Sequence, residues 1–185
     1  MTKQEIRSRM LERRKNIDEQ IKKQKNLKIA SSFIHFLETN SIKSILLYAS
    51  FGSEVDTWMI FQYCINKSIK TAFPKVNKKS NRLELFWVDK IEELTPGYKL
   101  ILEPSTSKRA LIENIDVIAV PGVAFDKQCF RIGYGGGFYD RLLLHKKGFA
   151  IGLAYEEQIV DKLPVLAHDK RVDLIITDER VISCV

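Results

Sequence analysis

The stretch VPGVAFD (residues 120–126), followed by RIGYGGGFYDR (residues 131–141), decides how this chain is organised. It begins where the apolar run Asp116–Val120 meets a Pro-Gly turn and ends at residues 142–144 (LLL), so its context predicts strand, glycine loop and helix. Glycines let backbone N–H groups approach an anion closely, and the first turn of a following helix adds unpaired donors. Arg131 and Arg141 flank the loop as candidate counter-charges. The stretch therefore predicts a phosphate-binding loop, although such a run of glycines is also typical of a flexible turn.

The flanking residues narrow the choice of family. The run lacks the Gly-Lys-Ser/Thr ending of a P-loop. Taken together, residues 120–126 and 131–141 closely resemble the signature of the 5-formyltetrahydrofolate cyclo-ligase family, also called methenyltetrahydrofolate synthetase. The resemblance covers essentially the whole chain. It implies an α/β fold, a single three-layer domain over residues 1–185 with a mainly parallel sheet, similar to sugar-phosphate isomerases and coenzyme A transferases.

Composition sets the broad class of the protein. The 185 residues are 45% apolar and 29% charged, which is ordinary for one soluble globular domain. No apolar run approaches the length of a membrane helix, and the charged N-terminus lacks the apolar core of a signal peptide. We therefore expect a cytoplasmic monomer without a membrane partner. Cys64, Cys129 and Cys184 are widely spaced, so we expect reduced thiols and no zinc site.

Positive charge is concentrated near the N-terminus. Of the net charge of +7, the first 28 residues contribute +6, from ten Lys/Arg and four Asp/Glu. Such a stripe can bind nucleic acid, but a solvated helix surface is favoured because no aromatic residue is interleaved before Phe33. A nucleotide triphosphate or the polyglutamate tail of a folate would also be attracted here. We therefore expect small anionic ligands and no nucleic acid.

Two helices are expected within residues 1–40. The first runs over Thr2–Arg14, with Ile6, Met10 and the stem of Arg13 on one side, and the second runs from near Asp18 to Thr39. They are predicted to form an antiparallel pair packed on the α/β core. Spacing alone makes Lys3 and Arg7 exposed charges on one helix face.

The remaining elements alternate between strand and helix. A helix is expected over Trp58–Ile65 and a helix-like turn over Glu156–Val160, and this alternation predicts a mainly parallel sheet with an antiparallel edge. Residues 95–99 and 102–105 are irregular and are candidates to cover the site. The expected strands are Ser44–Ala49, Lys70–Val76, Arg82–Val88, Asp116–Val120, Gly148–Ala154, Leu174–Thr177 and Val181–Cys184.

Two charged residues follow expected strands. Open α/β sheets bind ligands beyond the carboxyl ends of their strands. Glu54 follows the first strand, where it could serve the folate or merely assist the next helix, whose cap is expected at Asp56 or Thr57. Lys75 is placed just past the end of a strand, from which a cation could reach the cleft.

The resemblance implies the roles of individual residues. It implies that Glu54 and Ala49 contact the folate. It also implies that Asp140 and Asp169 bind Mg²⁺ together with ATP. Without the resemblance, Asp140 would be expected to cap a helix or to pair with Arg141. We expect Arg131 and Lys75 to serve catalysis. Three residues of the glycine loop are also implied to contact the folate, namely Tyr134, Gly136 and Phe138. The implied ATP ligands are Lys3, Arg7, Arg131, Gly133, Tyr134, Gly135, Gly136, Gly137, Phe138 and Tyr139.

The reaction implied by the resemblance converts 5-formyltetrahydrofolate, which can carry a polyglutamate tail, and ATP into 5,10-methenyltetrahydrofolate, ADP and phosphate. Phosphoryl transfer to the formyl oxygen would give an iminium phosphate, and the neighbouring amine would then close the ring. Because no protein nucleophile is required, His35, His145 and His168 need no catalytic role. The alternatives are a basic nucleic-acid-binding protein and an α/β sugar-phosphate isomerase-like enzyme that acts without ATP.

One residue departs from the family pattern. Cys129 occupies a position where the family usually has glycine. If the backbone there has positive φ, the cysteine is strained by about 1–2 kcal/mol.

Overall fold

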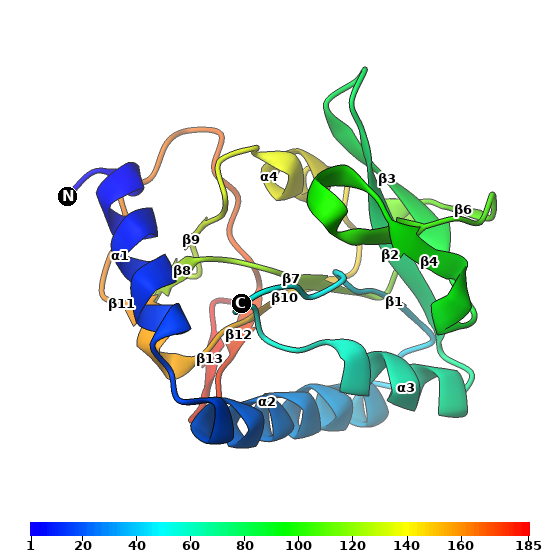
Figure 1. The fold of residues 1–185 in the computed structure, drawn as a ribbon, viewed down its shortest axis with the longest axis horizontal. Coiled ribbons are helices and arrows are strands. Elements are labelled where there is room, and N and C mark those ends of the chain that lie inside the picture. The colour runs from blue at the N-terminus through cyan, green and yellow to red at the C-terminus, as the bar shows by residue number, and fades with distance from the viewer.

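An eight-stranded sheet forms the middle layer of the computed structural model, which describes residues 1–185 (Figure 1). The order across the sheet is β13-β12-β10-β7-β1-β2-β3-β6. These strands are β1 (Ser44–Leu46), β2 (Lys70–Asn77), β3 (Arg82–Trp87), β6 (Arg109–Ala110), β7 (Val117–Val120), β10 (Phe149–Leu153), β12 (Leu174–Ile176) and β13 (Val181–Ser183).

Pairing within the sheet follows the apolar patterns. The five central strands β12, β10, β7, β1 and β2 are parallel, and β3, β6 and β13 are antiparallel at the two edges. All four residues of β7 are buried, as expected for a strand covered on both faces. The prediction of a mainly parallel sheet with antiparallel edges is confirmed. β1 pairs with β2 on one side and with β7 on the other, so the order in which successive strands are added to the sheet reverses at β1. Open α/β folds bind ligands at such a point.

Helices cover both faces of the sheet. The two longer ones, α2 (Glu19–Thr39) and α3 (Trp58–Asn66), lie together on one face, and the six-residue α4 (Phe138–Leu143) lies on the other (Figure 1). Ile29, Phe33 and Leu37 give α2 a buried stripe. None of the helices has both the length and the hydropathy of a membrane span.

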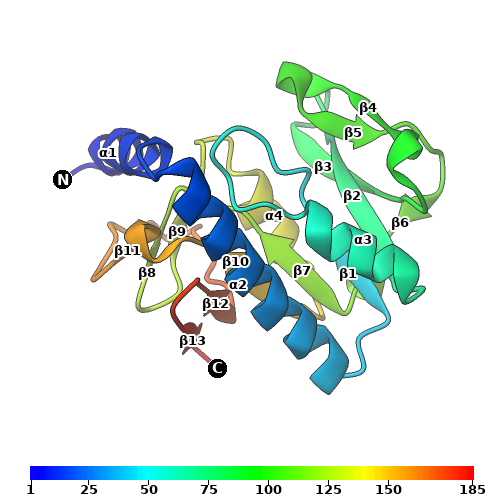
Figure 2. The ribbon, with the colours of Figure 1, turned by 60° about the horizontal axis from the view of Figure 1, so that its bottom comes forward.

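The two N-terminal helices do not form the expected antiparallel pair. α1 (Lys3–Lys15) packs against β8 and the turn Glu156–Gln158, whereas α2 packs against α3 and β12. Figure 2 shows α1 and α2 meeting near their ends and then diverging. The buried face of α1 consists of Ile6, Met10 and Arg14, so Arg14 and not Arg13 continues the i, i+4 stripe.

Short strands build two smaller sheets beside the main one. β8 (Ala124–Asp126) lies between β9 (Arg131–Ile132) and β11 (Ile159–Val160), and their apolar side chains pack against Ile6 and Met10 of α1. The expected helix-like segment Glu156–Val160 is instead one 3-10 turn followed by β11. β4 (Leu94–Pro96) and β5 (Leu102–Pro104) form an antiparallel pair, although the sequence predicted irregular structure there. Three further 3-10 turns span Ile91–Glu93, Tyr98–Leu100 and Ile112–Asn114.

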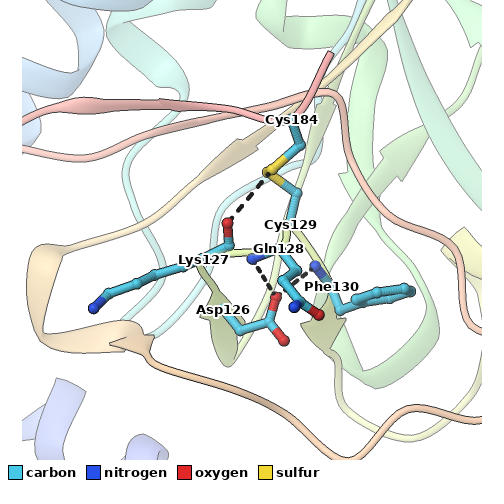
Figure 3. The surroundings of a disulfide bond; sticks show 6 residues. All are labelled: Asp126, Lys127, Gln128, Cys129, Phe130 and Cys184. Atoms are coloured by element: carbon cyan, nitrogen blue, oxygen red, sulfur yellow. Dashed lines mark hydrogen bonds between the residues drawn. A yellow bond between two sulfur atoms is a disulfide. The ribbon is translucent and has the colours of Figure 1, made fainter.

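The expectation of three reduced thiols is wrong for two of them. Cys129 and Cys184 form a disulfide, and Cys64 is free and buried (Figure 3). The bond joins residues 55 positions apart because β13 returns the chain to the loop that follows β8. Cys129 has φ +65°, so the positive φ considered above is present and the backbone is strained there. Asp126 supports this turn, since its carboxylate accepts the N–H groups of Gln128 and Phe130 (Figure 3).

Candidate active site

A cavity of about 570 Å³ opens beyond the carboxyl ends of β1, β2 and β7, beside the point where the order of the strands reverses. Its size is that of a small-molecule site. All of the predicted site residues except Lys75 and Arg141 line it. They are Lys3, Arg7, Ala49, Glu54, Arg131, Gly133, Tyr134, Gly135, Gly136, Gly137, Phe138, Tyr139, Asp140 and Asp169.

The glycine loop has a backbone that other residues rarely adopt. Gly135 has φ +107° and Gly137 has φ +64°, which only glycine reaches without strain. The guanidinium of Arg141 holds the loop through bonds from Nη2 to the carbonyls of Gly136 and Asn81, each 2.8 Å long. Arg141 therefore braces the loop and does not line the cavity, in contrast to its expected role as a counter-charge.

Helix α1 brings two predicted phosphate ligands to this loop. Nε of Arg7 donates to the carbonyl of Gly133 at 2.8 Å, and the ammonium of Lys3 forms an ion pair with Asp169. Asp169 also accepts the N–H of Leu166 at 2.7 Å. Burial opposes ionisation of Asp169, but the bonds from Lys3 and Leu166 and the nearby His168 hold its pKa below the usual value. Lys3, near the N-terminus, and Asp169, in the last part of the chain, thus meet at one wall of the cavity.

Arg131 is the most deeply buried cation of the site. Its side chain is 4% exposed, and Nη2 lies 3.3 Å from Oδ1 of Asp140. Neither Nε nor Nη2 makes a hydrogen bond, and the neighbouring hydroxyl of Tyr139 is also without a partner. Burial lowers the pKa of Arg131, and the charge of Asp140 opposes that shift. Buried donors without acceptors are rare, so this group is suited to an anion in the cavity.

The two carboxylates of the cavity have the chemistry of magnesium ligands. Asp140 accepts the N–H of Lys170 through Oδ1, and Asp169 accepts Lys3 and Leu166 through Oδ2, so each carboxylate keeps one oxygen without a hydrogen bond. No cluster of three or more acidic, His or Cys ligands is present. Two carboxylates fit Mg²⁺, which takes most of its remaining ligands from water and phosphate.

Glu54 lies in a different environment. Its side chain is buried, and Oε2 accepts the N–H of Phe51 at 3.1 Å. Burial raises the pKa of Glu54 to about 7, while the bond from Phe51, the charge of Arg14 and the hydroxyl of Tyr134 lower it. The helix start does not use Glu54, because Asp56 accepts the N–H of Trp58 at 2.7 Å. The carboxylate is therefore available to a ligand in the cavity.

An apolar wall completes the cavity, and sequence reasoning identified only part of it. The β4–β5 region contributes Tyr98, Ile101 and Leu102, which confirms that this region borders the site. Phe51 lies beside Tyr134 with ring centroids 5.8 Å apart. The lining residues that the sequence did not indicate include Pro74, Val76, Leu83, Pro121, Ile132, Leu166 and His168.

Lys75 is the one residue with a predicted catalytic role that does not line the cavity. It lies within β2, opposite Glu84, and not past the end of a strand as predicted. Pro74 and Val76 line the cavity, whereas Lys75 is exposed and does not. Because neighbouring residues of a strand point to opposite faces, its side chain is directed away from the cavity.

The basic N-terminal region is more fully paired than its sequence indicates. Lys3 pairs with Asp169, and Lys25 pairs with Asp178 at 2.6 Å and Glu157 at 2.9 Å. Arg14 is buried. These contacts pair or bury three of the ten cations in residues 1–28, namely Lys3, Arg14 and Lys25.

The sequence of this chain is similar to those of proteins of known family. Residues 1–178 match the model of the 5-formyltetrahydrofolate cyclo-ligase family. The chain is 25% identical to a mouse 5-formyltetrahydrofolate cyclo-ligase, over 96% of this chain and 94% of the mouse protein. It is 32% identical to the Escherichia coli K12 protein of the same name, over 75% of this chain and 79% of that one.

Solved structures agree with the sequence matches. A 5,10-methenyltetrahydrofolate synthetase from Aquifex aeolicus superposes with a TM-score of 0.89 at 35% identity, covering 100% of this chain and 93% of that one. Another from Mycoplasma pneumoniae gives a TM-score of 0.79 at 27% identity, covering 96% of this chain and 99% of that one. The chain therefore belongs to the 5-formyltetrahydrofolate cyclo-ligase family of enzymes.

Proposed function

We propose that this protein uses ATP to convert 5-formyltetrahydrofolate into 5,10-methenyltetrahydrofolate, with release of ADP and phosphate. The observation that carries the proposal is the buried guanidinium of Arg131, whose Nε and Nη2 have no hydrogen-bond acceptor inside a cavity that also contains the glycine loop. A transferring phosphoryl group would supply the missing acceptors. Family membership supports the choice of a folate as the other substrate.

The two substrates are assigned to different groups of residues. The nucleotide phosphates are assigned to Lys3, Arg7, Arg131 and the glycine loop, where the positive charge and the backbone donors are gathered. The pterin ring is assigned to Glu54, beside the aromatic rings of Phe51 and Tyr134. A carboxylate accepts hydrogen bonds from the amino and ring N–H groups of a pterin. With the substrates bound in this way, the γ-phosphate and the formyl group would face each other.

The chemical difficulty is that a formamide oxygen is a poor leaving group. When the γ-phosphoryl group of ATP is transferred to this oxygen, the bond between the phosphoryl group and ADP breaks and an iminium phosphate forms. The neighbouring folate amine then attacks the activated carbon, loses its proton and expels phosphate. The protein has to align donor and acceptor and balance the charge on the phosphoryl oxygens, for which Arg131 is suitably placed. Asp140 and Asp169 would hold Mg²⁺, which supplies further charge neutralisation when bound.

The test is the appearance of the methenyl chromophore when protein, 5-formyltetrahydrofolate, Mg²⁺ and ATP are mixed. We expect product only when ATP is present, in a one-to-one ratio with ADP. Arg131→Met should reduce the rate at least a hundredfold, since it removes a charge from the phosphoryl-transfer site. Lys75→Ala is the matched control and should keep the rate, because Lys75 lies outside the cavity. Product formation without ATP, or none with it, would refute the proposal.

A further inference from the structure

Arg14 is a buried cation without an anionic partner. It lies on the face of α1 that carries Ile6 and Met10, is 2% exposed and forms no ion pair with a carboxylate. Removing a guanidinium from water costs free energy that packing alone does not return. An apolar side chain would serve the helix interface at lower cost, so the charge at this position needs another explanation.

The guanidinium connects three segments of the cavity wall. Nε donates to Oγ of Ser53 at 2.9 Å, and Nη1 donates to the carbonyl of Gly122 at 3.2 Å. Nη2 donates to the hydroxyl of Tyr134 at 2.6 Å. These acceptors belong to the loop after β1, the turn after β7 and the glycine loop. The guanidinium donates from three nitrogens spread over a rigid plane, whereas the ammonium of a lysine would have to reach all three acceptors from one atom.

Two of these contacts converge on Glu54. Ser53 is its neighbour in the chain, and Tyr134 lines the same cavity as Glu54. The charge of Arg14 lowers the pKa of Glu54 against the effect of burial. Tyr48 and Tyr139 also face Glu54, and burial together with the charge of Glu54 raises the pKa of both hydroxyls, so they remain neutral. Arg14 is thus the cation that acts on Glu54.

We propose that Arg14 is a positioning residue for folate binding, which holds Tyr134 and the Glu54 loop in place from behind the cavity wall. Arg14 itself does not line the cavity. It acts through Tyr134 and Glu54, and it links the helix that carries Lys3 and Arg7 to the folate pocket. This inference rests on the proposed function, because that function assigns Glu54 to the pterin ring.

The test compares Arg14→Met, Arg14→Lys and the control Arg13→Met, which changes the exposed neighbour on the same helix. The first readout is a ¹³C-carboxyl NMR titration of the unliganded protein, with the Glu54 signal identified by its absence in Glu54→Gln. We expect Arg14→Met to raise the Glu54 midpoint by about one pH unit. Arg14→Lys should stay closer to wild type because it keeps the charge, and Arg13→Met should not change the midpoint.

The second readout is ligand affinity at pH 7. Arg14→Met should weaken 5-formyltetrahydrofolate roughly tenfold, from lost ionisation and lost positioning together, while ATP stays within about twofold. Arg14→Lys should also weaken the folate, because an ammonium cannot keep all three bonds. A variant that only melts earlier, with the midpoint and both affinities unchanged, would show that Arg14 is structural and overturn the inference.

Two further comparisons keep the inference testable. If Arg14→Met does not fold, Tyr134→Phe removes one acceptor and should also raise the Glu54 midpoint and weaken the folate, and no change in either would overturn the inference. The titration needs no folate. A raised midpoint in a protein that makes no product would refute the proposed function but keep the link between Arg14 and Glu54, whereas an unchanged midpoint in an active enzyme would refute the link alone.

Discussion

Arg131 and Asp140 form an ion pair at the wall of the cavity, with Nη2 of the arginine 3.3 Å from Oδ1 of the aspartate. Lys3 and Asp169 form a second such pair. In both pairs, a cation assigned to phosphate neutralises a carboxylate assigned to Mg²⁺. Each pair is therefore close to neutral, and under the proposed function a magnesium–nucleotide complex would exchange partners with both pairs without leaving a buried charge unpaired.

This exchange makes a prediction for Asp140→Asn. Without Mg²⁺, the variant should bind ATP more tightly than wild type, since Arg131 no longer has a competing carboxylate. In the complete reaction it should need a higher magnesium concentration for half-maximal rate. Both effects are measured by ATP titration in chelator and by a magnesium series. Asp161→Asn is the control, because Asp161 pairs with Lys127 and does not line the cavity. An unchanged magnesium dependence would reduce Asp140 to the partner of Arg131 and Lys170.

The N-terminal helix makes a separate prediction about the nucleotide. Lys3→Ala and Arg7→Ala should each weaken ATP roughly three- to tenfold, a modest loss because both side chains are partly exposed. Folate affinity should change little. The effect is measured by calorimetric titration of both ligands, with the exposed Lys15→Ala as control. If ATP affinity is the same in both variants, α1 contributes only packing.

The sequence predicted the main sheet because its central strands are apolar runs that have one structural solution. Residues 117–120 and 149–153 must be covered on both faces, so they become neighbouring parallel strands. The sheet order then brings Glu54, the glycine loop and Asp169 to one cavity from distant parts of the chain. Individual site residues followed from the resemblance, because their spacing alone indicated surface charges.

The errors have physical causes. β8, β9 and β11 have two or three residues each, which is too short for an alternating pattern. Without this small sheet, α1 had no surface to pack on, so it was paired with α2. The prediction that Lys75 lies past a strand end is wrong because β2 continues to Asn77, with Lys75 paired to Glu84 inside it. Arg14 lies among Arg13, Lys15 and other charges, where no pattern marks one arginine as buried.

The disulfide makes a prediction about stability. Cys129 and Cys184 close a loop with a sequence separation of 55, so in the chain-entropy description the bond is worth up to about 4 kcal/mol. Cys184→Ser, or reduction of the wild type, should lower the free energy of unfolding measured in urea by an amount of this order. Under reducing conditions the wild type and Cys184→Ser should match. Thiol titration of the unfolded, unreduced protein should find one thiol, from Cys64. Three thiols there would show that the bond does not form.

Glu54 makes a prediction about pH and folding. Because burial raises the pKa of Glu54 from 4.5 to about 7, this group favours the folded state most below pH 4.5, and that contribution is lost as pH rises through 7. Glu54→Gln removes the titration while keeping an acceptor for the N–H of Phe51. Relative to wild type, the variant should therefore gain stability between pH 4.5 and pH 8, on the order of 1–3 kcal/mol. Urea unfolding at both pH values measures it, and equal pH dependence in the two proteins would contradict the assignment.

The same substitution tests which substrate Glu54 serves. The proposed function assigns the ionised carboxylate to the donors of the pterin ring, so folate affinity of the wild type should rise as pH increases through about 7, the pKa of Glu54. Loss of a charged hydrogen-bond partner typically costs about 1.5–3 kcal/mol, which is roughly ten- to a hundredfold in affinity. We therefore expect Glu54→Gln to bind 5-formyltetrahydrofolate that much more weakly above pH 8, to lose the pH dependence, and to keep its ATP affinity. The helix start provides the internal control, since Asp56 accepts the N–H of Trp58 there without Glu54, and the variant should fold normally. If a folded Glu54→Gln protein keeps its folate affinity, the pterin ring does not bind at Glu54, and the donors of the ring must meet other acceptors in the cavity.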